Sequence, residues 1–198
     1  MALPQPVTLR GEATRQKLLA AAELEFGERG FAKASVSSIT RRAGVGQGTF
    51  YLYFPGKEAV LSELVRHMGR ELRRALAHAT AGLTHRLEVE QRGLAAFIAF
   101  SLAHKNLYRI VMESQFVDEA VYREYYRTLA QAYKVGLEEA QKSGQIRSGD
   151  AETQAWALMG IAHFLGLRYA IWEGTEPTPE ALQTVTDLLL HGLAGEGT

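Results

Sequence analysis

The sequence predicts an all-α protein, with an N-terminal three-helix domain followed by a longer helical C-terminal domain. Two observations lead to this class. Apolar residues recur at three- and four-residue steps through nearly all of the 198 residues, which is the spacing of amphipathic helices. No run of strict apolar–polar alternation is bounded by the paired turn signals that a β-hairpin requires. We therefore expect helices joined by short turns.

Three helices are expected before residue 57. The first covers about residues 14–29 and ends at Gly30, a residue typical of helix C-caps. Ser35 can cap a second, short helix over residues 36–43. Gly44-Val45-Gly46 breaks the chain before a third helix over residues 47–54.

Longer helices are predicted in the remainder of the chain. Asp118, Asp150 and Thr178 stand where three of these helices can be capped. The expected ranges are about 58–81, 86–104, 105–116, 119–142, 151–172 and 179–193. We expect the domain boundary after Lys57, with one domain over 1–57 and a second over 58–198.

Composition excludes several classes of protein. The residues are 46% hydrophobic and 22% charged, which is ordinary for a globular protein, and none is cysteine. Disulfides, thiol catalysis and cysteine-ligated metals are therefore excluded. No apolar stretch is long enough for a membrane span, and the first residues lack the pattern of a secretory signal. We expect a cytoplasmic protein with no membrane partner.

Charge is distributed unevenly although the net charge is zero. Residues 1–57 hold 8 basic and 4 acidic residues. The segment 33–57 contains Lys33, Arg41, Arg42 and Lys57 but no acid. Such a segment suits a polyanionic partner, although a basic face exposed only to solvent remains an alternative on charge alone.

Two short helices joined by a glycine-containing turn, within this acid-free segment, form the pattern of a helix-turn-helix. This motif places its second helix in the major groove of DNA. Val36, Ile39, Val45 and Phe50 can form the small core that sets the angle between the two helices. We expect the polar face of the second helix to point outward.

The motif residues resemble those of the TetR/AcrR family of transcriptional regulators. The resemblance lies in Phe26-x3-Gly30-Phe31, in the stretch ITRRAGV over 39–45, in GTFYLYF over 48–54, and in Lys57-Glu58. It implies a homodimeric repressor that binds a palindromic operator and leaves the DNA when its C-terminal domain binds a small molecule. Beyond about residue 64, the chain is similar to the family only in length and helical layout.

The resemblance also implies the residues that contact double-stranded DNA. Base or nearby phosphate contacts fall on the third helix, and phosphate contacts fall at its end, at the start of the fourth helix and at two earlier positions. These residues are Gln47, Gly48, Thr49, Tyr51, Tyr53, Lys57, Arg15 and Ser35. Two positions depart from the family pattern: Ala34 replaces a common hydroxyl residue, and Glu25 replaces a common apolar one.

The last two helices are the most apolar amphipathic pair, so we expect them to form a homodimer interface. Two recognition helices reach successive major grooves, about 34 Å apart, only in a dimer. The residues expected at this interface are Phe164, Leu167, Leu182, Val185, Leu189 and Leu193. Burial of the same residues inside a monomeric bundle is the alternative.

Aromatic residues are frequent in the middle helices and predict a site for a small, mostly apolar effector. Buried tyrosines need hydrogen-bond partners, which a ligand cavity can supply, although a dry aromatic core is the alternative. The expected lining residues are Phe97, Tyr108, Arg109, Met112, Phe116, Tyr126, Tyr133, Trp156, Met159 and His163.

Residues 107–126 and 160–168 are similar to family members that sense acyl-CoA thioesters, which implies such an effector. Guanidinium groups could then bind the phosphates of the coenzyme. The arginines available for this are Arg86, Arg92, Arg109, Arg123 and Arg127. Alternatively, these arginines pair with Glu90, Glu113, Glu119 or Glu124 on solvated helix faces.

No catalytic constellation is recognisable, so we expect neither an enzyme nor a bound cofactor or metal. The six histidines show no i, i+4 pairing that would favour a metal site. A different class of function remains open at this point. The chain could be a helical small-molecule-binding or adaptor protein whose basic N-terminal segment binds an acidic protein.

Overall fold

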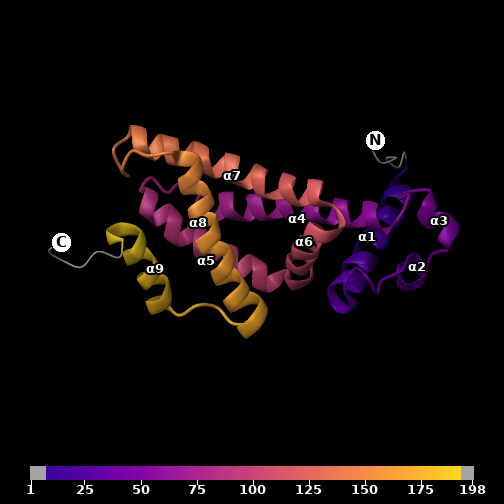
Figure 1. Ribbon diagram of the computed structural model, residues 1–198. Coiled ribbons are helices and arrows are strands. Elements are labelled where there is room, and N and C mark those ends of the chain that lie inside the picture. Colours follow the sequence, from indigo (N-terminus) through magenta and orange to yellow (C-terminus); the bar gives the residue numbers. More distant parts are fainter. Residues whose placement is uncertain (1–7, 193–198) are drawn as a thin grey trace. The chain divides into compact units, whose positions relative to one another are not determined.

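The structure is a computed structural model that describes residues 8–192, and it consists of helices and the loops between them (Figure 1). No strand occurs in the described range, so the predicted all-α class is confirmed. The elements are α1 (Leu9–Arg29), α2 (Val36–Ala43), α3 (Gln47–Tyr51), α4 (Lys57–Ala79), α5 (Arg86–Ala103), α6 (Lys105–Val117), α7 (Glu119–Lys142), α8 (Ala151–Gly166), η1 (Leu167–Glu173) and α9 (Pro179–His191).

Local capping explains where the N-terminal helices begin and end. α1 starts five residues earlier than predicted, because the Thr8 hydroxyl accepts a hydrogen bond from the Gly11 N–H at 3.1 Å. α2 has the predicted bounds. Ser35 and Ser38 cap it reciprocally, and Gly44 ends it in the left-handed region at φ 69°.

The chain packs as two compact units, each described here by itself. Among the described residues, the first unit contains 8–70 together with His104–Tyr126, and the second contains Glu71–Ala103 together with 127–192. Packing therefore groups α6 with the helix-turn-helix, although the two are far apart in sequence. The functional domains predicted at 1–57 and 58–198 stay a prediction.

In the first unit, α1 packs against both α2 and α6 (Figure 1). The buried apolar side chains come from each of its longer helices and from α3, which burial fixes to the rest of the unit. They include Leu18, Phe26, Ile39, Phe50, Phe54, Leu61, Met68 and Ile110.

In the second unit, α5 contacts α8, η1 and α9. A small core of Leu137, Ala151 and Ala155 lies between α7 and α8. The continuous α-helix predicted up to Trp172 is wrong, because α8 ends at Gly166 and residues 167–173 form a π-helix. Gly174, at φ 71°, terminates this segment.

α9 begins as predicted, with the Thr178 side chain as its cap and Pro179 in its first turn. Leu193, expected on the same apolar stripe, lies outside the described residues. Within residues 8–192, no helix combines the length and apolar character that crossing a bilayer requires.

Candidate DNA-binding surface and effector region

The exposed side of α3 carries the residues predicted to read DNA. Gln47 and Gly48 are exposed, Thr49 is half-buried, and Tyr51 is 57% exposed. Tyr53, just after the helix, is half-buried. Polar and aromatic groups that can reach base edges therefore lie on one short helix.

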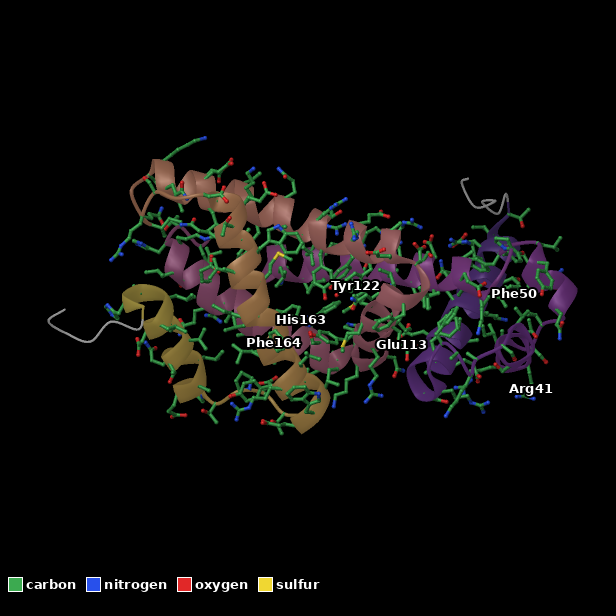
Figure 2. All side chains as sticks on the ribbon, in the orientation of Figure 1. Arg41, Phe50, Glu113, Tyr122, His163 and Phe164 are labelled. Atoms are coloured by element: carbon green, nitrogen blue, oxygen red, sulfur yellow. The ribbon has the colours of Figure 1, made fainter. Side chains whose placement is uncertain are left out.

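Buried aromatic residues fix this short helix from behind. Phe50 and Phe54 are fully buried, with ring centroids 5.8 Å apart, and the Tyr51 ring meets Phe50 edge-on at 5.4 Å. In Figure 2, Phe50 lies inside the first unit, whereas Arg41 extends from α2 at its periphery. Of the small core expected from the sequence, Ile39 and Phe50 are buried, whereas Val36 and Val45 are half-buried.

Lys57, which is expected to contact phosphate, also has partners within the protein. Its Nζ donates hydrogen bonds to the Phe31 and Ala34 carbonyl oxygens, each at 2.8 Å, and lies 4.2 Å from the centroid of the Phe31 ring. An ammonium group has three N–H donors, so one is left for a phosphate. Lys57 thus holds the α1–α2 turn and can still meet DNA.

The expected contact of Arg15 with the DNA backbone does not fit the structure. Arg15 is only 5% exposed, and its guanidinium lies 3.5 Å from the Glu63 carboxylate and 5.4 Å from the centroid of Phe54. A buried, paired guanidinium cannot reach a phosphate without leaving the core, so Arg15 is a structural residue of the first unit. Ser35, by contrast, is exposed at the N-terminus of α2, where phosphates bind readily.

Glu25, which departs from the family pattern, forms an ion-pair cluster that the sequence analysis missed. Its buried carboxylate accepts a hydrogen bond from Arg42 Nε at 2.7 Å and lies 3.6 Å from Arg29. Burial alone would raise the pKa of Glu25, but hydrogen bonds from Ser38 and Arg42 and the charge of Arg29 outweigh it and lower the pKa. Arg42 also pairs with Glu28, so its charge is largely neutralised within the protein.

Glu113 of α6 is a second residue that the sequence analysis did not place here. Its Oε2 accepts a hydrogen bond from the Phe31 backbone N–H at 2.7 Å. Figure 2 shows Glu113 on α6, at the side that meets α1. The α1–α2 turn is therefore held from two elements, by Glu113 and by Lys57.

The residues predicted to bind an effector are divided between the two units. In the first unit, Tyr108 is buried, Met112 and Tyr126 are half-buried, and Arg109 is exposed. Burial, with further contributions from neighbouring tyrosines, raises the pKa of both Tyr108 and Tyr126. Phe116 is 86% exposed and so does not belong to the interior of this unit.

In the second unit, Phe97, Met159 and His163 are half-buried, and burial lowers the pKa of His163. Tyr133 is held in a polar cluster, where its hydroxyl donates to Glu90 and its pKa is raised mainly by burial. Trp156, on α8, is 43% exposed and therefore does not lie in the interior of this unit.

The alternative for the arginines is confirmed for two of them. Arg86 pairs with Glu90, and Arg123 pairs with Glu119. Arg92, Arg109 and Arg127 are exposed and form no ion pair with any residue in the range 8–192. Only these three remain available for ligand phosphates.

Several apolar side chains on α8 and α9 are exposed, as a dimer interface requires. Phe164 is 67% exposed (Figure 2), and Leu182, Val185 and Leu189 are half-buried. Leu167 is buried within its own unit and so does not fit the expected contact with a second copy. The interface prediction omitted Leu188 and Leu190, which are also exposed on α9.

The geometry defines a helix-turn-helix DNA-binding regulator: a short, exposed helix with a polar face, backed by buried aromatic residues, follows a capped helix and a glycine-containing turn. Residues 18–64 match the family model described as bacterial regulatory proteins, tetR family. The HTH-type transcriptional regulator YdgC of Bacillus subtilis (strain 168) is 31% identical over 95% of this chain and 96% of its own length. The chain belongs to the TetR family of transcriptional regulators and is not an enzyme.

Further relatives match along most of the chain. EthR of Mycobacterium tuberculosis, also an HTH-type transcriptional regulator, is 29% identical over 91% of this chain and 85% of its own. The solved structure of FadR from Bacillus subtilis, in complex with stearoyl-CoA, has a TM-score of 0.78 at 22% identity, and covers 91% of this chain and 100% of its own. This likeness shows that the two proteins share a fold.

Proposed function

We propose that this regulator is a homodimeric repressor that binds a palindromic operator and is released by a long-chain acyl-CoA thioester. The observation that supports DNA reading is the exposed face of α3 with Gln47 and Tyr51, backed by buried Phe50. Family membership favours DNA over an acidic protein as the partner of the basic segment. A protein that occupies an operator blocks RNA polymerase directly, which favours repression. Because the operator would lie on the chromosome, we expect the protein to act in the cytoplasm.

The apolar surface of α8 and α9 supports the homodimer. Phe164, Trp156, Leu188 and Leu190 expose large apolar side chains there, and surfaces of this kind mark sites of protein association. We expect Phe164→Glu to convert dimer to monomer in sedimentation equilibrium. Phe116→Glu, a change at an exposed phenylalanine of α6, is the matched control and should leave the dimer intact. A wild-type protein that sediments as a monomer would refute the homodimer.

Operator binding is tested by titration of a palindromic duplex selected from a random library with the unaltered protein. We expect the logarithm of affinity to fall linearly with the logarithm of salt concentration, because protein cations displace counterions from phosphates. A duplex with one half-site scrambled should bind more weakly and with a smaller salt slope. Equal affinity for both duplexes would exclude recognition of a palindrome.

The chemistry of the first unit supports a ligand with an apolar chain and an anionic head. Half-buried apolar and aromatic side chains of this unit, such as Met112 and Tyr126, suit the apolar chain of the ligand. Arg109, which is exposed in the same unit, can supply a guanidinium group to phosphoryl oxygens. FadR, which shares the fold, was solved with stearoyl-CoA.

Calorimetric titration separates the parts of the effector. We expect stearoyl-CoA to bind and to release the selected duplex, and we expect stearate and free coenzyme A to bind more weakly. Arg109→Ala should weaken stearoyl-CoA binding without changing the weak binding of stearate. If stearate binds as tightly as its thioester, the phosphate contacts proposed here do not exist.

A further inference from the structure

Both backbone polar groups of Phe31 are bound by charged side chains from other helices. The N–H donates to Glu113 Oε2 of α6 at 2.7 Å, and the carbonyl accepts from Lys57 Nζ of α4 at 2.8 Å. Hydrogen bonds with one charged member are about twice as strong as neutral ones. The turn between α1 and α2 is therefore held at its centre, within the first unit, from both sides of its peptide chain.

α6 also lies closely against the end of α1. A Cβ atom added at Gly27 would lie 2.2 Å from the Asn106 side chain, and one at Gly30 would lie 3.1 Å from Glu113 Oε1. Gly30 has φ 77°, a conformation that L side chains rarely adopt. Glycine at both positions lets the α6 side chains approach the backbone, which explains how Glu113 reaches the turn.

The turn leads directly into the DNA-reading helices. Ala34, whose carbonyl also accepts from Lys57, precedes Ser35, the cap of α2. The orientation of α2, and with it that of α3, depends on the path of residues 30–35. A reading helix must be held to within about 0.5 Å for its contacts to form without a cost in ordering.

We propose that Glu113 is a positioning residue for DNA recognition, which orients the helix-turn-helix by binding the Phe31 N–H. Glu113 belongs to none of the residues expected to touch DNA, and it acts through the α1–α2 turn. The proposal rests on DNA binding alone and is independent of the effector and of the dimer interface.

The sign of the effect distinguishes positioning from electrostatics. Removal of a carboxylate from the DNA-binding unit should strengthen DNA binding if charge alone matters, because phosphates repel it. Positioning requires the opposite result for Glu113→Ala. Glu113→Gln removes the same charge but keeps a side-chain oxygen that can accept from the Phe31 N–H.

The experiment measures the Kd of the full chain for the duplex selected with the unaltered protein. We expect Glu113→Ala to raise the Kd about 10-fold, and Glu113→Gln to stay within about 3-fold of wild type. The controls are Glu119→Gln, for charge on the exposed start of α7, and Gln115→Ala, for truncation of an exposed α6 side chain. Both controls should bind as tightly as wild type or more tightly.

Amide hydrogen exchange gives a readout that general destabilisation would not produce. In Glu113→Ala, exchange should accelerate at Phe31 and its neighbours in the turn, while the fully buried core of α4 keeps its protection. All titrations are made well below the unfolding midpoint of each variant. The proposal is overturned if Glu113→Ala binds DNA as wild type does, or if glutamine fails to restore what alanine loses.

Discussion

Arg42 Nε donates to Glu25 Oε1 at 2.7 Å, and this bond connects the end of α2 to the C-terminal part of α1. The acid is buried and the arginine is partly exposed, so the pair lies at the edge of the core. Glu28 binds the other side of the same guanidinium through two hydrogen bonds. One arginine therefore crosslinks α2 to two turns of α1.

Arg42→Ala should lower the free energy of unfolding, because Glu25 would keep its burial but lose its main partner. Arg41→Ala is the matched control: the neighbouring arginine is exposed (Figure 2), and its loss should change stability by less than about 0.5 kcal/mol. Urea denaturation measures both. Equal effects of the two substitutions would show that the crosslink contributes nothing.

Stability should fall in acid as Glu25 is protonated. Its pKa in the folded state lies below the ordinary 4.5, so the ionised form is favoured by folding. The contribution is complete above pH 4.5 and is lost as the pH falls through the folded-state pKa. The difference in unfolding free energy between wild type and Glu25→Gln should therefore shrink below pH 4.5. A difference that stays constant down to pH 3 would contradict this sign.

Lys57→Ala should affect both stability and DNA binding. We expect a loss of about 2 kcal/mol in unfolding free energy, because two carbonyl oxygens lose a charged donor. We also expect the salt slope of DNA binding to fall by about 1, because one phosphate contact disappears. Lys33→Ala, a change at an exposed lysine of the same acid-free segment, should leave stability unchanged. An unaltered slope in Lys57→Ala would leave Lys57 with a structural role only.

Gln47→Ala should relax base preference more than it weakens binding to random DNA. The exposed amide can bond to an adenine edge, and such a contact is worth about 1–3 kcal/mol of discrimination. Parallel selection of duplexes with wild type and with the variant would show the position that becomes degenerate. Retention of the same preferences at every position would exclude Gln47 from base reading.

Two glycine-to-alanine changes should have opposite effects on stability. Gly27→Ala would force α6 away from α1 and should cost about 1–3 kcal/mol, because the new Cβ overlaps Asn106. Gly93→Ala, in the middle of α5, has its nearest neighbour at an ordinary 4.0 Å and should stabilise the protein by about 0.5–1 kcal/mol. Thermal unfolding of both variants provides the test, and a stabilised Gly27→Ala would mean that the two helices are not in close contact.

Elements with a local signal were predictable from the sequence. α2 lies between its N-cap, Ser35, and its C-cap, Gly44. Both residues are recognisable in the sequence and lie within ten residues of each other, so they determined the predicted range of this helix. The π-helical turns after Gly166 were missed, because an apolar pattern does not distinguish wider helical turns from α-helical ones. The early start of α1 was missed because Thr8 caps it from a segment with few apolar residues.

The functional residues divide in the same way. The exposure of Gln47 and Tyr51 follows from the short motif around them. Glu113 lies 82 residues from its partner Phe31, and a single sequence gives no signal for a contact at that separation. Glu25 was visible in the sequence as an acid at a position that is commonly apolar, but the arginines that pair with it could not be identified from one sequence.

The grouping of α6 with the helix-turn-helix determines how parts of this regulator can be exchanged with those of a relative. A chimera joined at Lys57 would transfer α1–α3 without Asn106 and Glu113. These two side chains contact the end of α1 and the α1–α2 turn. The transplanted segment would then meet a foreign α6 whose side chains need not match Gly27 and Gly30. Exchange of residues 104–126 together with α1–α3 keeps the packing of α6 against α1. The natural module for engineering is therefore discontinuous in sequence.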